Sequence, residues 1–131
     1  MTAEEPAWVD LTAVLLAHEI IVAETGGHGG IRDVGLLESA LERPVNRWRY
    51  EGEDEISRLA AIYGVAVAKN HPFIDGNKRS AFMCLNIFLE ANGRRLTASE
   101  DDATETMLAV AAGEIGEDGL ADWIVVNSES T

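Results

Sequence analysis

The side chains best suited to chemistry lie together in residues 71–79, His-Pro-Phe-Ile-Asp-Gly-Asn-Lys-Arg. His71 can take a proton from a hydroxyl near neutral pH, and Asp75 supplies the hard oxygen ligand that Mg²⁺ prefers. Lys78 adds a point charge, and Arg79 adds a planar fork that fits phosphate oxygens. A base, a metal ligand and two cations are the set needed for transfer from a nucleotide, where catalysis consists mainly of positioning and charge neutralisation.

The remaining residues of this segment predict its backbone. Pro72 has no N–H and disfavours the α conformation before it, so we expect a helix to end near Asn70. Phe73 is expected to turn into the core, and Gly76 allows a conformation or a close approach that a side chain would prevent. Asn77 fits the start of the next helix, whose free N–H groups and dipole form an anion site.

The plainer interpretation of the same segment is an ordinary helix start, in which the acid and amide are caps and the cations are solvated. Each residue alone would deserve that interpretation. The coincidence of several required roles within nine residues favours a functional site.

Apolar stretches on both sides of this segment predict two buried helices, over residues 55–70 and 77–92. A helix that is apolar nearly all round belongs in a core, and a short loop between two such helices is held rigidly. Within these helices, Tyr63 and Asn86 should find polar partners if they are buried, and Cys84 is expected to be a small core residue.

The rest of the chain also predicts helices, over residues 8–25, 33–43, from Ser99 onward and 120–126. In the second of these, Pro44 is expected to end the helix. In the one that begins at Ser99, the side chains expected to pack inward are Met107, Leu108, Val110 and Ala111. The predicted fold class is all-α, with no convincing strand pair and at most a short flap hairpin.

The segments between these helices are expected to be loops. Residues 26–30 are glycine-rich but lack the P-loop pattern, so they indicate a flexible connection with His28 exposed. His18, in the first helix, is expected to be a partly buried helix residue rather than a catalyst. The plainer interpretation of residues 45–55 is a surface loop with Trp48 in the core, and the tail from Asn127 is expected to be disordered.

Composition narrows the class of protein. A length of 131 residues predicts one domain over 1–131, with an ordered core over about 8–125. One cysteine excludes an internal disulfide and suits a reducing compartment. A net charge of −13 argues against direct binding to nucleic acid. No apolar run approaches a membrane span, and the acidic residues 1–7 are unlike a secretory signal, so we expect a cytoplasmic protein.

Residues 71–79 resemble the signature of the Fic/Doc superfamily, and a lysine at position 78 resembles its Doc (death-on-curing toxin) branch. Residues 30–44 and 88–96 are similar to segments that Doc-like chains carry before and after the signature. The resemblance thus extends over most of residues 8–125. It implies a Fic-type helical bundle around a central buried helix pair, with a flap near the active site in residues 45–55.

The resemblance implies a role for each residue of the signature. His71 corresponds to the general base that acts on a target hydroxyl, and Asp75 to the residue that holds Mg²⁺. Gly76, Asn77 and Arg79 correspond to the segment that binds phosphates during catalysis.

The residue at position 78 bears on the reaction. Most Fic enzymes have glycine there and move AMP from ATP onto a protein, whereas lysine accompanies a reversed nucleotide and transfer of the γ-phosphoryl group. Lys78 therefore implies a protein kinase that uses ATP and Mg²⁺ and blocks translation. The implied target is a hydroxyl of translation elongation factor Tu.

The implied partner is a small antitoxin of the Phd type. Many Fic proteins carry an inhibitory Ser/Thr-x-x-x-Glu-Gly/Asn motif, and this sequence has no match to it, so the inhibitor is expected to be a separate chain. Two alternatives stay open: a Fic-type AMP transferase, and an inactive module that only binds an antitoxin. The intact His71, Asp75, Asn77 and Arg79 disfavour the second alternative.

Overall fold

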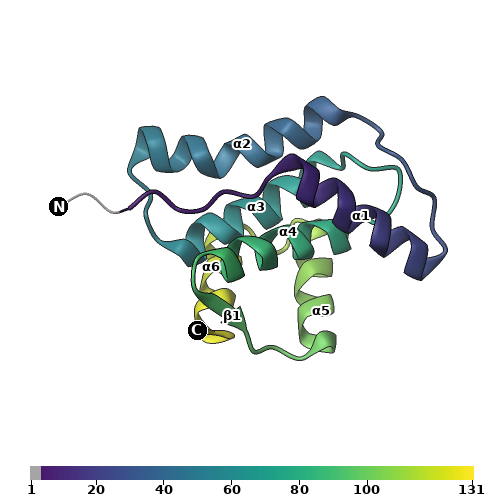
Figure 1. Ribbon diagram of the computed structural model, residues 1–131. Helices are drawn as coiled ribbons and strands as arrows, with labels where there is room; N and C mark the ends of the chain where they lie inside the picture. Colours follow the sequence, from purple (N-terminus) through teal and green to yellow (C-terminus); the bar gives the residue numbers. More distant parts are fainter. Residues whose placement is uncertain (1–3) are drawn as a thin grey trace.

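The computed structural model describes residues 4–131, which form six helices and two short strands (Figure 1). Their bounds are α1 Leu11–Thr25, α2 Val34–Glu51, α3 Ile56–Asn70, α4 Asn77–Ala91, β1 Arg94–Leu96, α5 Glu100–Ala111, α6 Glu117–Val126 and β2 Ser128–Ser130. The all-α fold class predicted from the sequence is confirmed.

Helix α3 is the centre of the core. Each residue from Leu59 to Ala68 is buried, as its all-round apolar sequence predicts. Helices α2, α4 and α6 pack against it, and α1 and α5 pack against α4 (Figure 1). Gly64 permits this packing, because a Cβ there would lie 2.9 Å from Leu85 of α4. The predicted central helix pair is therefore α3 with α4.

Local signals explain where several helices begin. Asp10, Asp33 and Ser99 each lie at an N-cap, where the side chain accepts a hydrogen bond from a main-chain N–H of the first turn. Within α3, Tyr63 has the expected polar partner, since its hydroxyl accepts a hydrogen bond from the N–H of Val9 at 3.1 Å.

The prediction that Pro44 ends the second helix is wrong. Helix α2 continues to Glu51 with Pro44 buried inside it, so residues 45–51 are helical and form neither a loop nor a flap hairpin. Tertiary contacts hold the extension: Trp48 meets Trp8 edge-on at 6.0 Å, and Arg47 bonds to Glu117 of α6 at 2.6 Å. These contacts offset the hydrogen bond that proline removes.

Three further predictions from the sequence are wrong, and the first is the absence of a convincing strand pair, because β1 and β2 form one. The tail is ordered after Asn127, because β2 pairs antiparallel with β1, Arg94 opposite Ser130 and Leu96 opposite Ser128. In α5, Met107 and Val110 are buried as expected, but Leu108 is 50% exposed and Ala111 is also exposed.

Hydropathy agrees with this architecture. None of the helices in residues 4–131 combines the length and apolar character needed to cross a bilayer.

Candidate functional site

The loop between α3 and α4 begins with a sharp reversal. Helix α3 ends at Asn70 as predicted, and His71 adopts the left-handed conformation, with φ 52° and ψ 53°. This conformation is uncommon for a residue other than glycine and needs support from its surroundings. Arg32 supplies that support: its guanidinium donates to the carbonyl oxygen of His71 at 2.9 Å and to that of Asn70 at 3.1 Å.

The segment before α2 also holds the loop through its main chain. The N–H groups of Arg32 and Asp33 both donate to the carbonyl oxygen of Pro72, at 2.8 and 3.0 Å. A further bond joins the N–H of Ile74 to the carbonyl oxygen of Gly30, beside an isolated antiparallel bridge. The end of the glycine-rich connection is therefore fixed to the loop.

Asn77 closes the loop from inside. Its buried side chain accepts from the N–H of Phe73 and donates to the carbonyl oxygen of the same residue, both at 2.9 Å. The sequence predicted Asn77 as an N-cap or first-turn residue of α4, and it is the latter, since Gly76 occupies the cap. Its amide is committed to the loop backbone, so only its main-chain N–H remains to face an anion.

Phe73 anchors the loop in the core, as predicted. Its side chain is fully buried and stacks on the imidazole of His18 from α1, with ring centroids 3.8 Å apart and planes 9° from parallel. His18 is itself 3% exposed, and its Nε2 lies 2.8 Å from the carbonyl oxygen of Asp75. His18 is thus a fully packed neighbour of the loop, although the sequence indicated only a partly buried helix residue.

Asp75 presents its carboxylate at the surface. One oxygen accepts a hydrogen bond from the N–H of Gly76 at 2.9 Å. The other lies over Gly27, where a Cβ would come within 2.6 Å of it. Gly76 has φ 79°, so the glycine that the sequence predicted for this turn is required by its conformation.

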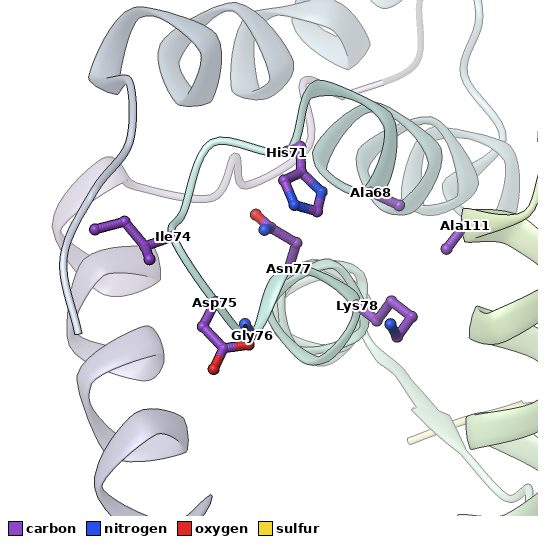
Figure 2. A pocket seen from close by; sticks show the side chains of 8 residues that line it. All are labelled: Ala68, His71, Ile74, Asp75, Gly76, Asn77, Lys78 and Ala111. Carbon is purple, nitrogen blue, oxygen red and sulfur yellow. Dashed lines mark hydrogen bonds between the residues drawn. The ribbon is translucent and has the colours of Figure 1, made fainter. Parts of the chain in front are cut away.

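A cavity of about 190 Å³ lies at the N-terminus of α4 (Figure 2). Its lining residues are Ala68, His71, Ile74, Asp75, Gly76, Asn77, Lys78 and Ala111. Figure 2 looks nearly along α4 and shows His71 on one side of the helix start, with Asp75 and Lys78 on opposite flanks. The cavity thus brings together the predicted base, the predicted metal ligand and one predicted cation.

Arg79 does not line this cavity. It is exposed in the first turn of α4, next to Lys78, and neither cation takes part in an ion pair within the described residues. Both charges are therefore available to an anion at the helix N-terminus, where the dipole also favours negative charge. Reaching the cavity would require the Arg79 side chain to turn toward it.

The donor set fits Mg²⁺ bound together with a phosphate chain better than a metal held by protein alone. Residues 4–131 contain no cluster of three or more His, Cys, Asp or Glu side chains able to hold a metal. Mg²⁺ in nucleotide sites takes one or two carboxylates and completes its shell with phosphate oxygens and water. Asp75 is the carboxylate that the cavity offers.

The positioning residues of this site were the part that sequence reasoning missed. Arg32 and Gly27 carry no individual signal in the sequence, and the pattern around His18 indicates only a helix residue. The available clue is the Gly-Ile-Arg-Asp segment at residues 30–33, which resembles Doc-like chains but does not by itself reveal a structural role. Residues 45–55 contribute nothing to the lining of the cavity.

The chain is similar to known proteins over most of its length. The Fic/DOC family model matches residues 8–89, which include the whole loop and all but the last two residues of α4. The chain is 34% identical over 111 residues to Protein kinase doc of Escherichia phage P1, covering 85% of this chain and 87% of that protein. It is also 34% identical over 119 residues to Toxin Doc of Mycolicibacterium smegmatis, covering 85% of this chain and 90% of that protein. The family match and the two relatives together establish that the chain belongs to the Fic/DOC family.

Proposed function

We propose that this protein is a Doc-like toxin that transfers the γ-phosphoryl group of ATP to a hydroxyl of a protein target in the cytoplasm. The observation that carries the proposal is the shared cavity, where His71, Asp75 and Lys78 surround the N-terminus of a buried helix. The similarity to a protein named Protein kinase doc over most of both chains supports the choice of reaction.

Each side chain has a chemical role in this proposal. His71 takes the proton from the target hydroxyl as the oxygen attacks the γ-phosphorus and the bond to the β-phosphate oxygen breaks, leaving ADP. Asp75 would hold Mg²⁺, which neutralises charge on the phosphate chain. The N–H groups at Gly76 and Asn77, with Lys78 and Arg79, would bind the phosphate oxygens.

Lys78 is the residue on which the choice of phosphate depends. It stands on the flank of α4 opposite Asp75, with Ala111 of α5 beside the same cavity (Figure 2). A long cation on that flank takes space and adds charge where a glycine would leave the helix end open. We propose that it favours attack at the γ-phosphorus over attack at the α-phosphorus.

A labelling experiment tests the reaction directly. The protein is incubated with a candidate target and ATP labelled at either the α- or the γ-phosphate. We expect protein-bound label from γ-labelled ATP alone. Label from α-labelled ATP would instead establish an AMP transferase, the first alternative, and no label with any target would favour the second alternative, an inactive antitoxin-binding module.

A companion variant asks what the lysine contributes. In Lys78→Gly we expect less γ-transfer and more α-transfer, measured as the ratio of the two labels on the same target. The control is Lys69→Gly, which removes an exposed lysine near the end of α3 that does not line the cavity. An unchanged ratio in Lys78→Gly would remove this residue as the determinant of the transferred group.

We propose translation elongation factor Tu as the target, because blocked translation is the effect expected of a Doc toxin. The test adds purified elongation factor Tu and γ-labelled ATP to the protein and follows both labelling and the output of a cell-free translation system. We expect the labelled factor to lose activity in step with incorporation. Labelling of another translation factor, with elongation factor Tu untouched, would keep the kinase and replace the target.

The inhibitor is proposed to be a separate Phd-like antitoxin. The sequence has no inhibitory Glu motif, and the two relatives include a protein named Toxin Doc. We expect co-expression with a small gene neighbouring its own to relieve growth arrest and to yield a stable complex. Cells that tolerate the active protein alone would contradict the toxin assignment.

A further inference from the structure

His18 lies outside residues 71–79, yet its side chain packs against Phe73 and the main chain of Asp75 in that segment. Its imidazole stacks on Phe73, with centroids 3.8 Å apart, and its Nε2 lies 2.8 Å from the carbonyl oxygen of Asp75. It also closes the space beside Gly76, whose hypothetical Cβ would lie 3.7 Å from the ring. One buried side chain of α1 therefore lies against three residues of the turn.

The chemistry of this contact fixes the direction of the hydrogen bond. A main-chain carbonyl oxygen can only accept, so Nε2 of His18 carries the proton and donates it. The bond holds the carbonyl of Asp75 toward α1. The carboxylate of the same residue is held separately, because one oxygen accepts a hydrogen bond from the N–H of Gly76 and the other lies over Gly27.

We propose that His18 is a positioning residue that sets the orientation of Asp75 for binding Mg²⁺ with a nucleotide. The inference rests on the proposed function, in which Asp75 is the protein's metal ligand. His18 does not line the cavity and touches neither metal nor substrate. It acts through the backbone of Asp75, as outer partners of metal ligands commonly do, and their loss typically lowers metal affinity about 10- to 100-fold.

Two substitutions separate the hydrogen bond from the packing. His18→Phe keeps an aromatic ring on Phe73 and removes the donor. His18→Gln keeps an N–H near the position of Nε2 and removes the ring. His28→Phe is the matched control, because His28 is exposed in the connection after α1 and makes no side-chain hydrogen bond within the described residues.

The measurement is ATP binding with Mg²⁺ and with EDTA, by calorimetry, so it does not depend on turnover. In His18→Phe we expect the gain in affinity that Mg²⁺ confers to fall by about tenfold, with ATP affinity in EDTA unchanged. His18→Gln should recover most of that gain, and His28→Phe should match the wild type. Equal loss in Mg²⁺ and EDTA, or no loss in His18→Phe, would overturn the proposal.

A second readout separates this inference from the proposed function. Amide exchange reports the turn itself, and we expect faster exchange at Gly76 in His18→Phe, restored in His18→Gln, with Leu120 in α6 unchanged. If the wild type binds no ATP, the proposed function fails while exchange still decides whether His18 orders Asp75. Unchanged exchange at Gly76 would refute the positioning role even in an active kinase.

Discussion

Side chains of the signature fall into two groups according to the direction in which they point. Phe73 and Asn77 point inward, and their burial shapes the loop. His71, Asp75 and Lys78 border the cavity and are free to meet a ligand. The inward pair fixes the loop backbone, so the outward side chains need no ion pairs among the described residues to be placed at the cavity.

The first prediction concerns the proposed base. His71→Ala should abolish phosphoryl transfer. Among the other residues that line the cavity, the carboxylate of Asp75 is the one group able to take the hydroxyl proton near neutral pH, and the proposal assigns that carboxylate to Mg²⁺. Nucleotide affinity should stay within about twofold, since the imidazole is not part of the phosphate site. Labelling assays and calorimetry measure the two quantities, and His28→Ala is the control. Retained transfer would remove His71 as the base.

The second prediction concerns Asn77, for which the structure adds an architectural role. Asn77→Ala leaves the buried N–H and carbonyl of Phe73 without their partner, so we expect a loss of about 2–4 kcal/mol in the free energy of unfolding. Asn86→Ala is the comparison. Asn86 lies on the same helix, but its side chain is only half-buried and makes no hydrogen bond among the described residues. Urea denaturation measures both. Equal stability of the two variants would show that the loop does not depend on this amide.

At the scale of helices, the sequence predicted the elements whose local signal was strong. The apolar runs of α3 and α4, the turn at Gly76 and the burial of Phe73 all follow from periodicity and backbone preference. The first helix was also predictable. These features depend on residues close together in the chain.

The parts that could not be predicted depend on distant contacts. Pro44 is tolerated inside α2 because Trp48 and Arg47 contact residues that are distant in the sequence. The residues around Pro44 give no signal of these contacts. The contact of His18 with the carbonyl oxygen of Asp75 likewise forms only when α1 packs against a loop 57 residues later. The local sequence favours a helix end at Pro44 and an ordinary helix residue at His18. In both places, tertiary packing overrides that local preference.

The third prediction belongs to α4, which buries the thiol of Cys84. Burial raises the pKa of this thiol above its ordinary value of 9.0, so the folded protein keeps the proton while the unfolded chain loses it. Stability is therefore fully present below pH 9.0 and falls as pH rises toward the folded pKa, by up to about 1.4 kcal/mol per pH unit.

The test compares wild type with Cys84→Ala across alkaline pH. We expect the variant to be less stable near neutrality because it leaves a small cavity, but to lose stability less steeply above pH 9.0. Burial also raises the pKa of Tyr63 above its ordinary value of 10.0. Both proteins should therefore lose further stability above pH 10.0. Parallel curves for the two proteins would show that Cys84 does not ionise differently in the two states.

At the scale of the whole molecule, the chain's last residues return to the middle of the sequence. Strand β2 pairs with β1, and Ser128 also accepts two hydrogen bonds on its hydroxyl from the guanidinium of Arg94. Glu129 and Arg95 form an ion pair on the same small sheet. The sheet follows the C-terminal end of α4, a helix about 22 Å long whose other end carries the site.

The fourth prediction uses that separation. Deleting residues 128–131 should lower the free energy of unfolding by about 1–3 kcal/mol, because the lost bonds are few and largely exposed. ATP affinity should not change, since the site lies at the far end of α4. Thermal unfolding and calorimetry measure the two effects. A large fall in ATP affinity with unchanged stability would mean that residues 128–131 affect ATP binding at the opposite end of α4.

Pairing between residues 30–33 and the loop is made by main-chain atoms, apart from the guanidinium of Arg32. The side chains of Ile31 and Ile74 project from it and are 40% and 55% exposed. Substitutions at both positions should therefore change the surface beside the cavity at little cost to the main-chain pairing that holds the loop. A library randomised at these two positions should yield mostly folded members. The surface formed by Ile31 and Ile74 is therefore a suitable place to seek altered recognition of the proposed protein target.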